Sequence, residues 1–507
     1  MNVMNMESTR TAPGPGVLFK RRPAKGKLFR ARDRGPVAVS EPAAGGLEVS
    51  RTDSRGKHRL AFAGIFLFTL LMYSRPHEIW PQYFGWLPLP KLVAVSSILI
   101  YVLSKLTAGE RLIIWTLELK LMTIFWALGL FFAPVAASPS DSFNVLFDPL
   151  IKILIVFALQ ITLIDTRSRY RAMLGVMVFC QILYSVSSIS TFMSGGFSEN
   201  QSFHARISGW GEYLSNPNDI ACLLALMAPL SVILALSQRG WKRWLLFFCV
   251  AVAAVAILCT YSRSGFLALI ASSGLLVWKA TRGRRLTILL PVTVLAAVLL
   301  VAAPGKYMTR LSTIFNPETD PTNSAQERQE HMKRAMDLAI RRPIVGVGIG
   351  NFHIYAINEM RAHNAFLETA AELGVFGLIA FLLIIFAPLR SLIRIERETS
   401  ANGAWPDPGK NIVSGCLQAS FVAFVIYAFF GSIQYDSYLY SLVAFAVAFR
   451  RIHAAEIHAL ATAGDGAEAG DDAKASTALV LSGRAKGSLW RSHGFLERRL
   501  NGVRGSR

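Results

Sequence analysis

The stretch RAHNAFLETAAELGVFG, residues 361–377, places a histidine and two carboxylates at the start of an apolar run. Glu368 and Glu372 are four residues apart, so a helix would carry them on one face, one turn after Asn364. A neutral imidazole at His363 has the chemistry of a general base that takes a proton from a hydroxyl. Two alternatives stay open: His363 could cap the helix at an interface, and the glutamates could simply favour the helix dipole.

A second polar stretch, HARISGWGEYLSNPNDIACLLAL at residues 204–225, leads into a hydrophobic helix. Arg206 precedes a glycine-rich turn, and an anion could bind it beside the N-terminal dipole of that helix. Asn216 or Asn218 can cap the first turn, with Pro217 tolerated at an early helical position. Capping accounts for the asparagines as well as a functional role does, but it does not account for Arg206.

Arg263 lies between two apolar runs that are separated only by YSRSG, within CTYSRSGFLALIA at residues 259–271. An arginine at this depth is unfavourable unless it snorkels to water or is paired, so it is a candidate functional residue. The planar guanidinium group is suited to forked contacts with phosphate oxygens. The alternative is a turn arginine that snorkels.

The segment 304–363 contains a predicted helix followed by a glycine-rich connection. AQERQEHMKRAMDLAIRRP has apolar residues at helical spacing and ends before Pro343, which predicts an amphipathic helix that carries Arg328. PIVGVGIGNF then alternates glycine with other residues. It has no Walker lysine and no strand–helix frame, which argues against a nucleotide loop. We favour a tight connection in which the backbone approaches other segments closely.

These stretches belong to a chain of 507 residues that is 53% hydrophobic and 17% charged, with a mean hydropathy of +0.40. A soluble protein would have a lower apolar share. The sequence therefore predicts an all-α polytopic integral membrane protein. About twelve spans have the length that a transmembrane helix needs, near residues 60–75, 90–106, 121–138, 147–164, 172–190, 217–237, 243–261, 264–280, 285–303, 364–387, 412–431 and 436–450.

The formal net charge of +21 is explained by membrane topology rather than by nucleic acid, because no recognition motif accompanies it. Basic residues collect in alternate connections and in both tails, which the positive-inside rule predicts when both termini are cytoplasmic. Arg206, Arg263 and the arginines of segment 304–363 then fall on the outer side, against that rule. A function is expected to retain them there.

The sequence predicts three parts. Residues 1–58 are a basic tail rich in proline and glycine, and residues 452–507 are a polar tail; both are predicted to be disordered and cytoplasmic. Residues 59–451 form the transmembrane helical domain, with one large extracytoplasmic loop at 304–363.

The polar stretches, in this order, resemble the O-antigen ligase/polymerase superfamily of bacterial surface-polysaccharide enzymes. The matching elements are RISG…NPND, YSRSGFLAL, ER…A…RRPIVGVGIGNF and HNAFLETAAELGVFGLIAFLL, over about residues 200–390. The resemblance implies a GT-C-like, inverting glycosyltransferase that uses no metal or other cofactor. It implies a glycan donor on polyprenyl (undecaprenyl) diphosphate and a sugar, lipid A–core or protein acceptor. The reaction would take place at the outer face of the bacterial inner membrane, in O-antigen or exopolysaccharide biosynthesis.

Residue by residue, the resemblance assigns Arg206 and Arg263 to the diphosphate, and Arg328 to a further basic position. It assigns His363 to activation of the acceptor, with Asn364 beside it. Fixed cations would stabilise the charge that develops on the leaving diphosphate, so no divalent metal is required. We expect Asn218 and Glu368 to support these residues.

Ligation to lipid A–core, polymerisation of repeat units and O-glycosylation of protein share these motifs and stay open as alternatives. From another class, a transporter for lipid-linked glycans would show internal repeats, or broken helices with charges at mid-membrane. The sequence shows no repeat, and its candidate charges lie at the outer boundary. A purely structural membrane scaffold would leave the outer arginines without a role.

Overall fold

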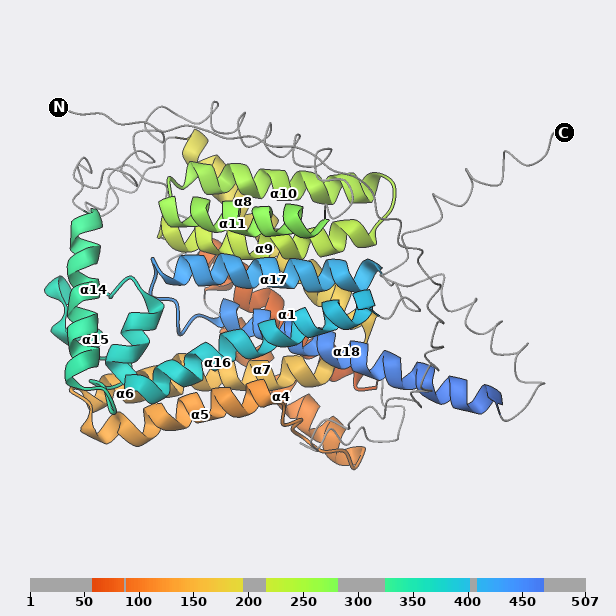
Figure 1. The fold of residues 1–507 in the computed structure, drawn as a ribbon, viewed down its shortest axis with the longest axis horizontal. Helices are drawn as coiled ribbons and strands as arrows, with labels where there is room; N and C mark the ends of the chain where they lie inside the picture. Colours follow the sequence, from red (N-terminus) through yellow and green to blue (C-terminus); the bar gives the residue numbers. More distant parts are fainter. Residues whose placement is uncertain (1–56, 86–87, 195–215, 281–323, 402–407, 469–507) are drawn as a thin grey trace, which may run out of the picture. The chain divides into compact units, whose positions relative to one another are not determined.

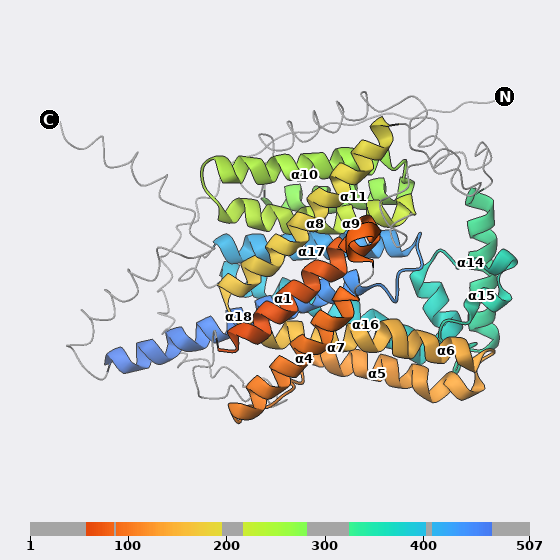
Figure 2. The same cartoon turned by 180° about the vertical axis from the view of Figure 1, so that it is seen from behind.

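The computed structural model describes residues 57–85, 88–194, 216–280, 324–401 and 408–468, all within one compact unit, Ser54–Arg507. Regular structure in these ranges is entirely helical (Figures 1 and 2). The helices are α1 (Arg59–Ser74), α2 (Pro76–Ile79), α3 (Pro81–Phe84), α4 (Leu89–Thr107), α5 (Leu117–Phe132), η1 (Ala133–Val135), α6 (Pro139–Val145), η2 (Leu146–Leu150), α7 (Ile151–Leu163), α8 (Arg167–Met193), α9 (Pro217–Ser237), α10 (Trp241–Cys259), α11 (Arg263–Ala280), α14 (Ser324–Arg341), α15 (Phe352–Tyr355), η4 (Ile357–Glu359), α16 (Ala365–Ala401), α17 (Pro408–Ala428) and α18 (Ser437–Glu468).

Within the described ranges, 8 helices are long and apolar enough to cross a membrane. They are Leu89–Thr107, Leu117–Val135, Pro139–Leu163, Arg167–Met193, Pro217–Ser237, Trp241–Cys259, Ala365–Thr399 and Asn411–Ala428. The all-helical, multi-span prediction is confirmed, but the predicted number of about twelve spans is not. α1, α11 and α18 overlap three further predicted spans without meeting the same requirements of length and apolar content. The predicted span 285–303 lies outside the described residues, as does the first part of the predicted loop 304–363.

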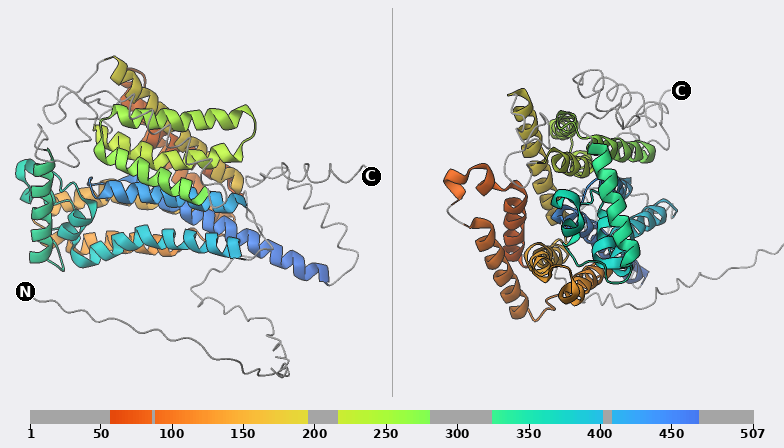
Figure 3. Two further views of the ribbon diagram at one scale, coloured as in Figure 1. Left: turned by 45° about the horizontal axis from the view of Figure 1, so that its top comes forward. Right: turned by 90° about the vertical axis from the view of Figure 1, so that its left-hand side faces the viewer.

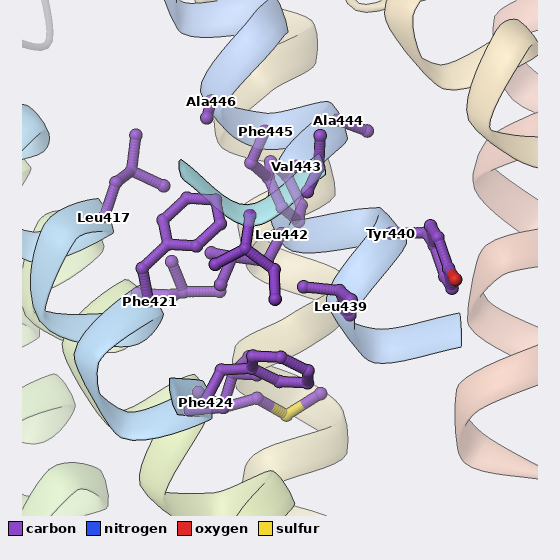
Figure 4. Packing of buried hydrophobic residues seen from close by; sticks show 14 of the residues in the cluster. Leu417, Phe421, Phe424, Leu439, Tyr440, Leu442, Val443, Ala444, Phe445 and Ala446 are labelled. Carbon is purple, nitrogen blue, oxygen red and sulfur yellow. The ribbon is translucent and has the colours of Figure 1, made fainter. Parts of the chain in front are cut away.

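The core forms around two helices that are apolar on most of their surface. α9 packs against α8, α10, α11 and α17, and most of its residues are buried. A helix that is apolar on all sides belongs in the interior of a bundle. α16 packs against α5, α17 and α18. Figure 4 shows apolar side chains of α17, among them Phe421 and Phe424, beside those of α18, among them Leu439 and Leu442.

α14 lies crosswise at one end of these helices (Figures 1 and 3). It is the amphipathic helix that the sequence predicted, and it ends at Arg341, before Pro343. Ala335 and Leu338 on its inner face pack in a small apolar cluster with Phe352 of α15 and Leu367 of α16. This packing fixes α14 against the start of α16.

The glycine-rich connection after α14 pairs with an interruption in α16. Gly374 has φ 65° and ψ −164°, so the helix is broken there, although the sequence predicted one uninterrupted span. Around the break, the Val347 amide donates to the Ala371 carbonyl (2.9 Å) and the Gly348 amide donates to the Glu372 carbonyl (3.0 Å). The predicted close backbone approach of this connection is therefore confirmed.

Replacing Gly346 by alanine should destabilise the protein. Its φ is +70°, and an added Cβ would lie 2.4 Å from the carbonyl carbon and oxygen of Glu372, which are backbone atoms that cannot rotate away. We expect a loss of about 2 kcal/mol or more, because left-handed strain and the clash add. The measurement is thermal unfolding of the detergent-solubilised protein. Gly175→Ala, in α8, is the matched control: a Cβ there meets nothing within 4 Å, so stability should be unchanged or slightly higher.

α18 continues to Glu468, past residue 452, where the sequence predicted the tail to begin. Two forked ion pairs hold this helix to the bundle. Arg450 donates to both carboxylate oxygens of the fully buried Glu118, at 2.6 and 2.7 Å. Farther along, Arg167 of α8 donates in the same forked manner to Glu456. The alanine-rich sequence beyond Arg451 also has a high helix propensity. The spacing of apolar residues alone did not predict that the helix continues there.

Candidate active site

Six of the seven predicted site residues lie in the described chain, and Arg206 lies outside it. Asn218, Arg263 and Glu368 lie in the first turns of α9, α11 and α16, His363 and Asn364 directly precede α16, and Arg328 lies on α14. Together with the α17–α18 turn (residues 429–436), these first turns form what we call the site end of the bundle.

Asn364, rather than His363, caps α16. The Asn364 Oδ1 atom accepts hydrogen bonds from the amides of Phe366 and Leu367, both at 3.0 Å. This satisfies two of the amides that a helix N-terminus leaves without partners. The cap also contacts the α17–α18 turn, where Asn364 Nδ2 donates to the Phe429 carbonyl (3.4 Å). Capping is thus accounted for without the histidine.

His363 has a left-handed backbone conformation, with φ +53°. Its amide donates to the Ser432 Oγ atom of the α17–α18 turn (3.0 Å). A non-glycine residue in this region of φ is strained, and such strain persists where the surroundings hold it. The imidazole lies beside α14, with its ring centroid 6.4 Å from that of His331 and the two planes at 63°.

Glu368 anchors the backbone just before His363 and the α17–α18 turn that the His363 amide contacts. Its side chain is fully buried and receives hydrogen bonds from four groups: the Arg361 Nε atom (2.7 Å), the Ala362 amide (2.9 Å), the Gln434 Nε2 atom (2.9 Å) and the Ser432 hydroxyl. A carboxylate that accepts four hydrogen bonds has a structural role, because its oxygens are already occupied and are not available to take a proton from a substrate. Glu368 therefore joins α16 to the α17–α18 turn, and its predicted supporting role at the site stays a prediction.

Arg361 is a cation of the site that the sequence indicated only as one of the arginines of segment 304–363. Partial burial lowers the pKa of its guanidinium, but the carboxylates of Glu368 and Glu372 outweigh this effect and raise the pKa above its ordinary value. Arg361 is thus a permanent cation. Its side chain is 48% exposed, so the guanidinium can reach a ligand while its Nε atom is held by Glu368.

The His363 imidazole is neutral at physiological pH. Burial, together with the nearby cation Arg328, with His331 and with Arg361, lowers the pKa of His363 from 6.5 to about 3. The ring therefore keeps an unprotonated nitrogen at every pH at which a cell operates. This is the protonation state that a general base requires.

The lowered pKa of His363 predicts a specific pH dependence of stability. Below pH 6.5 the unfolded chain binds a proton at this histidine and the folded protein does not, so stability falls as the pH drops from 6.5 towards 3. His363→Gln should remove this contribution, with a slope of up to about 1.4 kcal/mol per pH unit. Thermal unfolding of both proteins between pH 7 and pH 4.5 is the measurement. A wild-type midpoint that falls in parallel with that of the variant would contradict the prediction.

The first turns of α9 and α11 are joined by Asn218. Asn216 caps α9, with its Oδ1 atom accepting from the Asn218 amide (2.9 Å) and Pro217 following at the first helical position. The Asn218 side chain then accepts from the Ser262 hydroxyl (2.9 Å), directly before Arg263. Asn218 therefore holds the short turn on which Arg263 lies, while Asn216 and not Asn218 is the cap; a functional role of Asn218 stays a prediction.

Hydrogen bonds continue from α9 to the segment around His363. The Tyr427 hydroxyl of α17 donates to Asp219 in the first turn of α9 (2.9 Å). The next residues along the chain form the α17–α18 turn, which holds Asn364 and His363. The turn of Arg263 and the histidine thus belong to one connected structure.

Glu372 fixes the glycine-rich connection to the same end. Its side chain accepts from the Phe352 amide (3.1 Å) and from the Tyr435 hydroxyl. For the two glutamates, the sequence left open an effect on the helix dipole alone. The structure shows that both of them also hold the α17–α18 turn, a role that no local pattern reveals.

Sequence reasoning missed His331 and the polar residues Ser432, Gln434 and Tyr435. The available signal for His331 was helical spacing, because it lies one turn after Arg328 on the inner face of α14. For the turn residues the signal was a polar run between two apolar segments, which the sequence analysis treated only as a connection.

The fold and the site define a class: a multi-pass helical membrane protein in which a neutral histidine lies among fixed cations at one end of the bundle. Residues 248–382 match the family model described as O-antigen ligase (Wzy_C), so the chain carries an O-antigen ligase domain. The match includes Arg263, Arg328, His363, Asn364 and Glu368, and it implies an O-antigen ligase/polymerase-family activity on lipid-linked glycans. No curated protein matches the chain.

Proposed function

We propose that this protein transfers a glycan from a polyprenyl-diphosphate carrier to an acceptor hydroxyl at the outer face of the bacterial inner membrane. The acceptor is lipid A–core, a growing polysaccharide or a protein. The observation that carries the proposal is the neutral imidazole of His363, with Arg328 and Arg361 beside it. A base next to fixed cations suits a reaction that removes a proton from the nucleophile and leaves negative charge on the departing group.

The proposed reaction is a single displacement. The unprotonated nitrogen of His363 takes the proton of the acceptor hydroxyl while the acceptor oxygen forms its bond to the anomeric carbon. The bond between that carbon and the diphosphate oxygen breaks, and its electron pair leaves with the polyprenyl diphosphate. Attack from the face opposite the leaving group inverts the anomeric configuration.

Cationic side chains carry the electrostatic part of the reaction. Arg263 begins α11, and Arg328 and Arg361 lie beside His363, so fixed positive charge is in place before the leaving group gains its own. Preorganised charges need no reorganisation as the bond breaks, and they act more strongly in a site from which water is largely excluded. We propose on this chemistry that the transfer needs no divalent metal.

The substrate class also agrees with the site's position in the bundle. The site end lies at the first turns of α9 and α16, both of which are long apolar helices that could cross a membrane. A polyprenyl chain could therefore remain in the bilayer while its diphosphate reaches the cations. The distribution of basic residues supports cytoplasmic termini and a site that faces outward.

Arg263→Ala provides the test. Purified protein is given a polyprenyl-diphosphate glycan and candidate acceptors, and release of polyprenyl diphosphate is followed with and without EDTA. We expect the variant to lose about 10²–10³-fold in turnover, as expected when one preorganised donor to a developing anion is removed. Arg263→Lys keeps the charge but not the forked geometry and should be intermediate. Wild-type turnover by Arg263→Ala would exclude Arg263 from the site, and no release by the wild-type protein with any acceptor class would contradict the proposed function.

A further inference from the structure

A second histidine lies beside His363 and has no role in the reaction described above. His331 is 4% exposed, and its Nδ1 atom is buried without a hydrogen-bond partner among the described residues. Its ring contacts that of His363, with the centroids 6.4 Å apart. Buried polar nitrogens in proteins are almost always satisfied, so an unpartnered one next to a candidate catalytic base calls for an explanation.

Packing does not explain this histidine. Arg328, His331, Ala335 and Leu338 recur at helical spacing and share the inner face of α14. Ala335 is fully buried there and Leu338 packs against the same apolar cluster, so a leucine at position 331 would suit that face. His353 offers a comparison from α15, since its Nδ1–H group donates to the Gly350 carbonyl (2.9 Å) and has a structural partner. Within the part of the chain that the structure describes, the Nδ1 atom of His331 has no such partner.

The charges around His331 favour an anionic ligand. On α14, Glu327 and Glu330 face it together with Arg334, and Arg328 lies one turn away; on the segment before α16, His363 and Arg361 lie close to the pair. Burial is the largest effect on the pKa of His331 and lowers it. Arg334 lowers this pKa further, whereas Glu327 and Glu330 raise it, and the net shift is downward. An anion bound at the Nδ1 atom of His331 would favour the protonated form of this histidine, so its binding should be coupled to proton uptake by His331.

We propose that His331 is a diphosphate-binding residue, in which the Nδ1–H group donates to an oxygen of the donor's diphosphate held between α14 and the start of α16. The inference rests on the proposed function, because the diphosphate group comes from the donor. It adds a second residue of α14, after Arg328, to the contacts with the donor's diphosphate. It also couples donor binding to proton uptake by His331, while His363 stays unprotonated as the base.

The test uses the full chain in detergent micelles with farnesyl diphosphate as the probe. Binding is measured by calorimetry near pH 6.5 in two buffers of different ionisation enthalpy, which gives both the affinity and the number of protons taken up. His331→Leu should bind about tenfold more weakly or worse and take up fewer protons. His331→Asn, whose amide can replace the Nδ1–H donor, should keep most of the affinity but lose the same proton uptake. His353→Gln, the matched control, should bind like the wild-type protein.

Folding of the variants is checked independently. His331→Leu removes an unsatisfied buried nitrogen, so its thermal midpoint should equal or exceed that of the wild-type protein. If the wild-type protein binds farnesyl diphosphate and His331→Leu binds it equally well with the same proton uptake, the role of His331 is overturned. If the wild-type protein itself does not bind the probe, the proposed function is what fails.

Discussion

His363→Ala is expected to lower the rate of glycan transfer by about 10²–10⁴-fold, the usual contribution of a general base. The loss should appear in turnover at saturating donor and not in donor affinity, because the fixed cations of the site remain. The measurement is single-turnover release of polyprenyl diphosphate at neutral pH. Since alanine leaves room where the ring was, added imidazole should restore part of the activity.

The control for this variant is His353→Ala. His353 comes from the same polar segment, but its ring is bound to the Gly350 carbonyl, so its loss should leave transfer nearly unchanged. His363→Gln adds a second comparison, because glutamine keeps the volume and polarity of the side chain and cannot take the proton. An alanine variant that turned over at the wild-type rate would mean that the acceptor proton goes elsewhere.

Features that depend on near neighbours in the sequence were predictable. The Asn216–Pro217 start of α9 follows from capping preferences, and α14 follows from apolar spacing that ends before Pro343. The glycines of the connection predicted close backbone approach, since only a residue without a Cβ fits beside another carbonyl. Each of these inferences uses one rule that acts within a few residues.

Features that depend on distant residues were not predictable. The side chain of Glu368 accepts hydrogen bonds from Ser432 and Gln434, which are 64 and 66 residues away along the chain. A local sequence pattern cannot predict contacts between residues this far apart. The break at Gly374 was hidden because a glycine inside an apolar run is tolerated in a transmembrane helix. The structure gives the reason for this break: amides of the glycine-rich connection form hydrogen bonds with carbonyls of α16 just before Gly374.

The same distinction explains why the sequence can propose His363 as a base but cannot predict its surroundings. Its residue type and its position before a helix suggested a base, whereas its electrostatic setting comes from α14 and from the cations next to it. The protonation state that makes it suitable is therefore a property of tertiary structure. Glu368 stabilises much of this tertiary structure. Its carboxylate accepts hydrogen bonds from the backbone before His363 and from the turn that the His363 amide contacts.

Glu368→Gln should be the most destabilising conservative change at the site end. The carboxylate is fully buried and accepts from four groups, whereas an amide has one acceptor oxygen and brings an NH₂ group that faces existing donors. Leaving one or two buried donors unsatisfied costs about 1–3 kcal/mol each. The ion pair with Arg361 adds less than a fully buried pair would, because water screens the half-exposed guanidinium. We expect a total loss of about 3–5 kcal/mol.

Thermal unfolding of Glu368→Gln beside Glu398→Gln separates this effect from a general loss of charge. Glu398 lies on the same helix and is exposed, so the same substitution there should change stability by about 0.5 kcal/mol or less. Transfer activity gives the second measurement. Because Glu368 holds the backbone before His363 and the turn that the His363 amide contacts, activity should fall at temperatures at which the variant is still folded. A variant as stable and as active as the wild-type protein would show that the α17–α18 turn is held without this carboxylate.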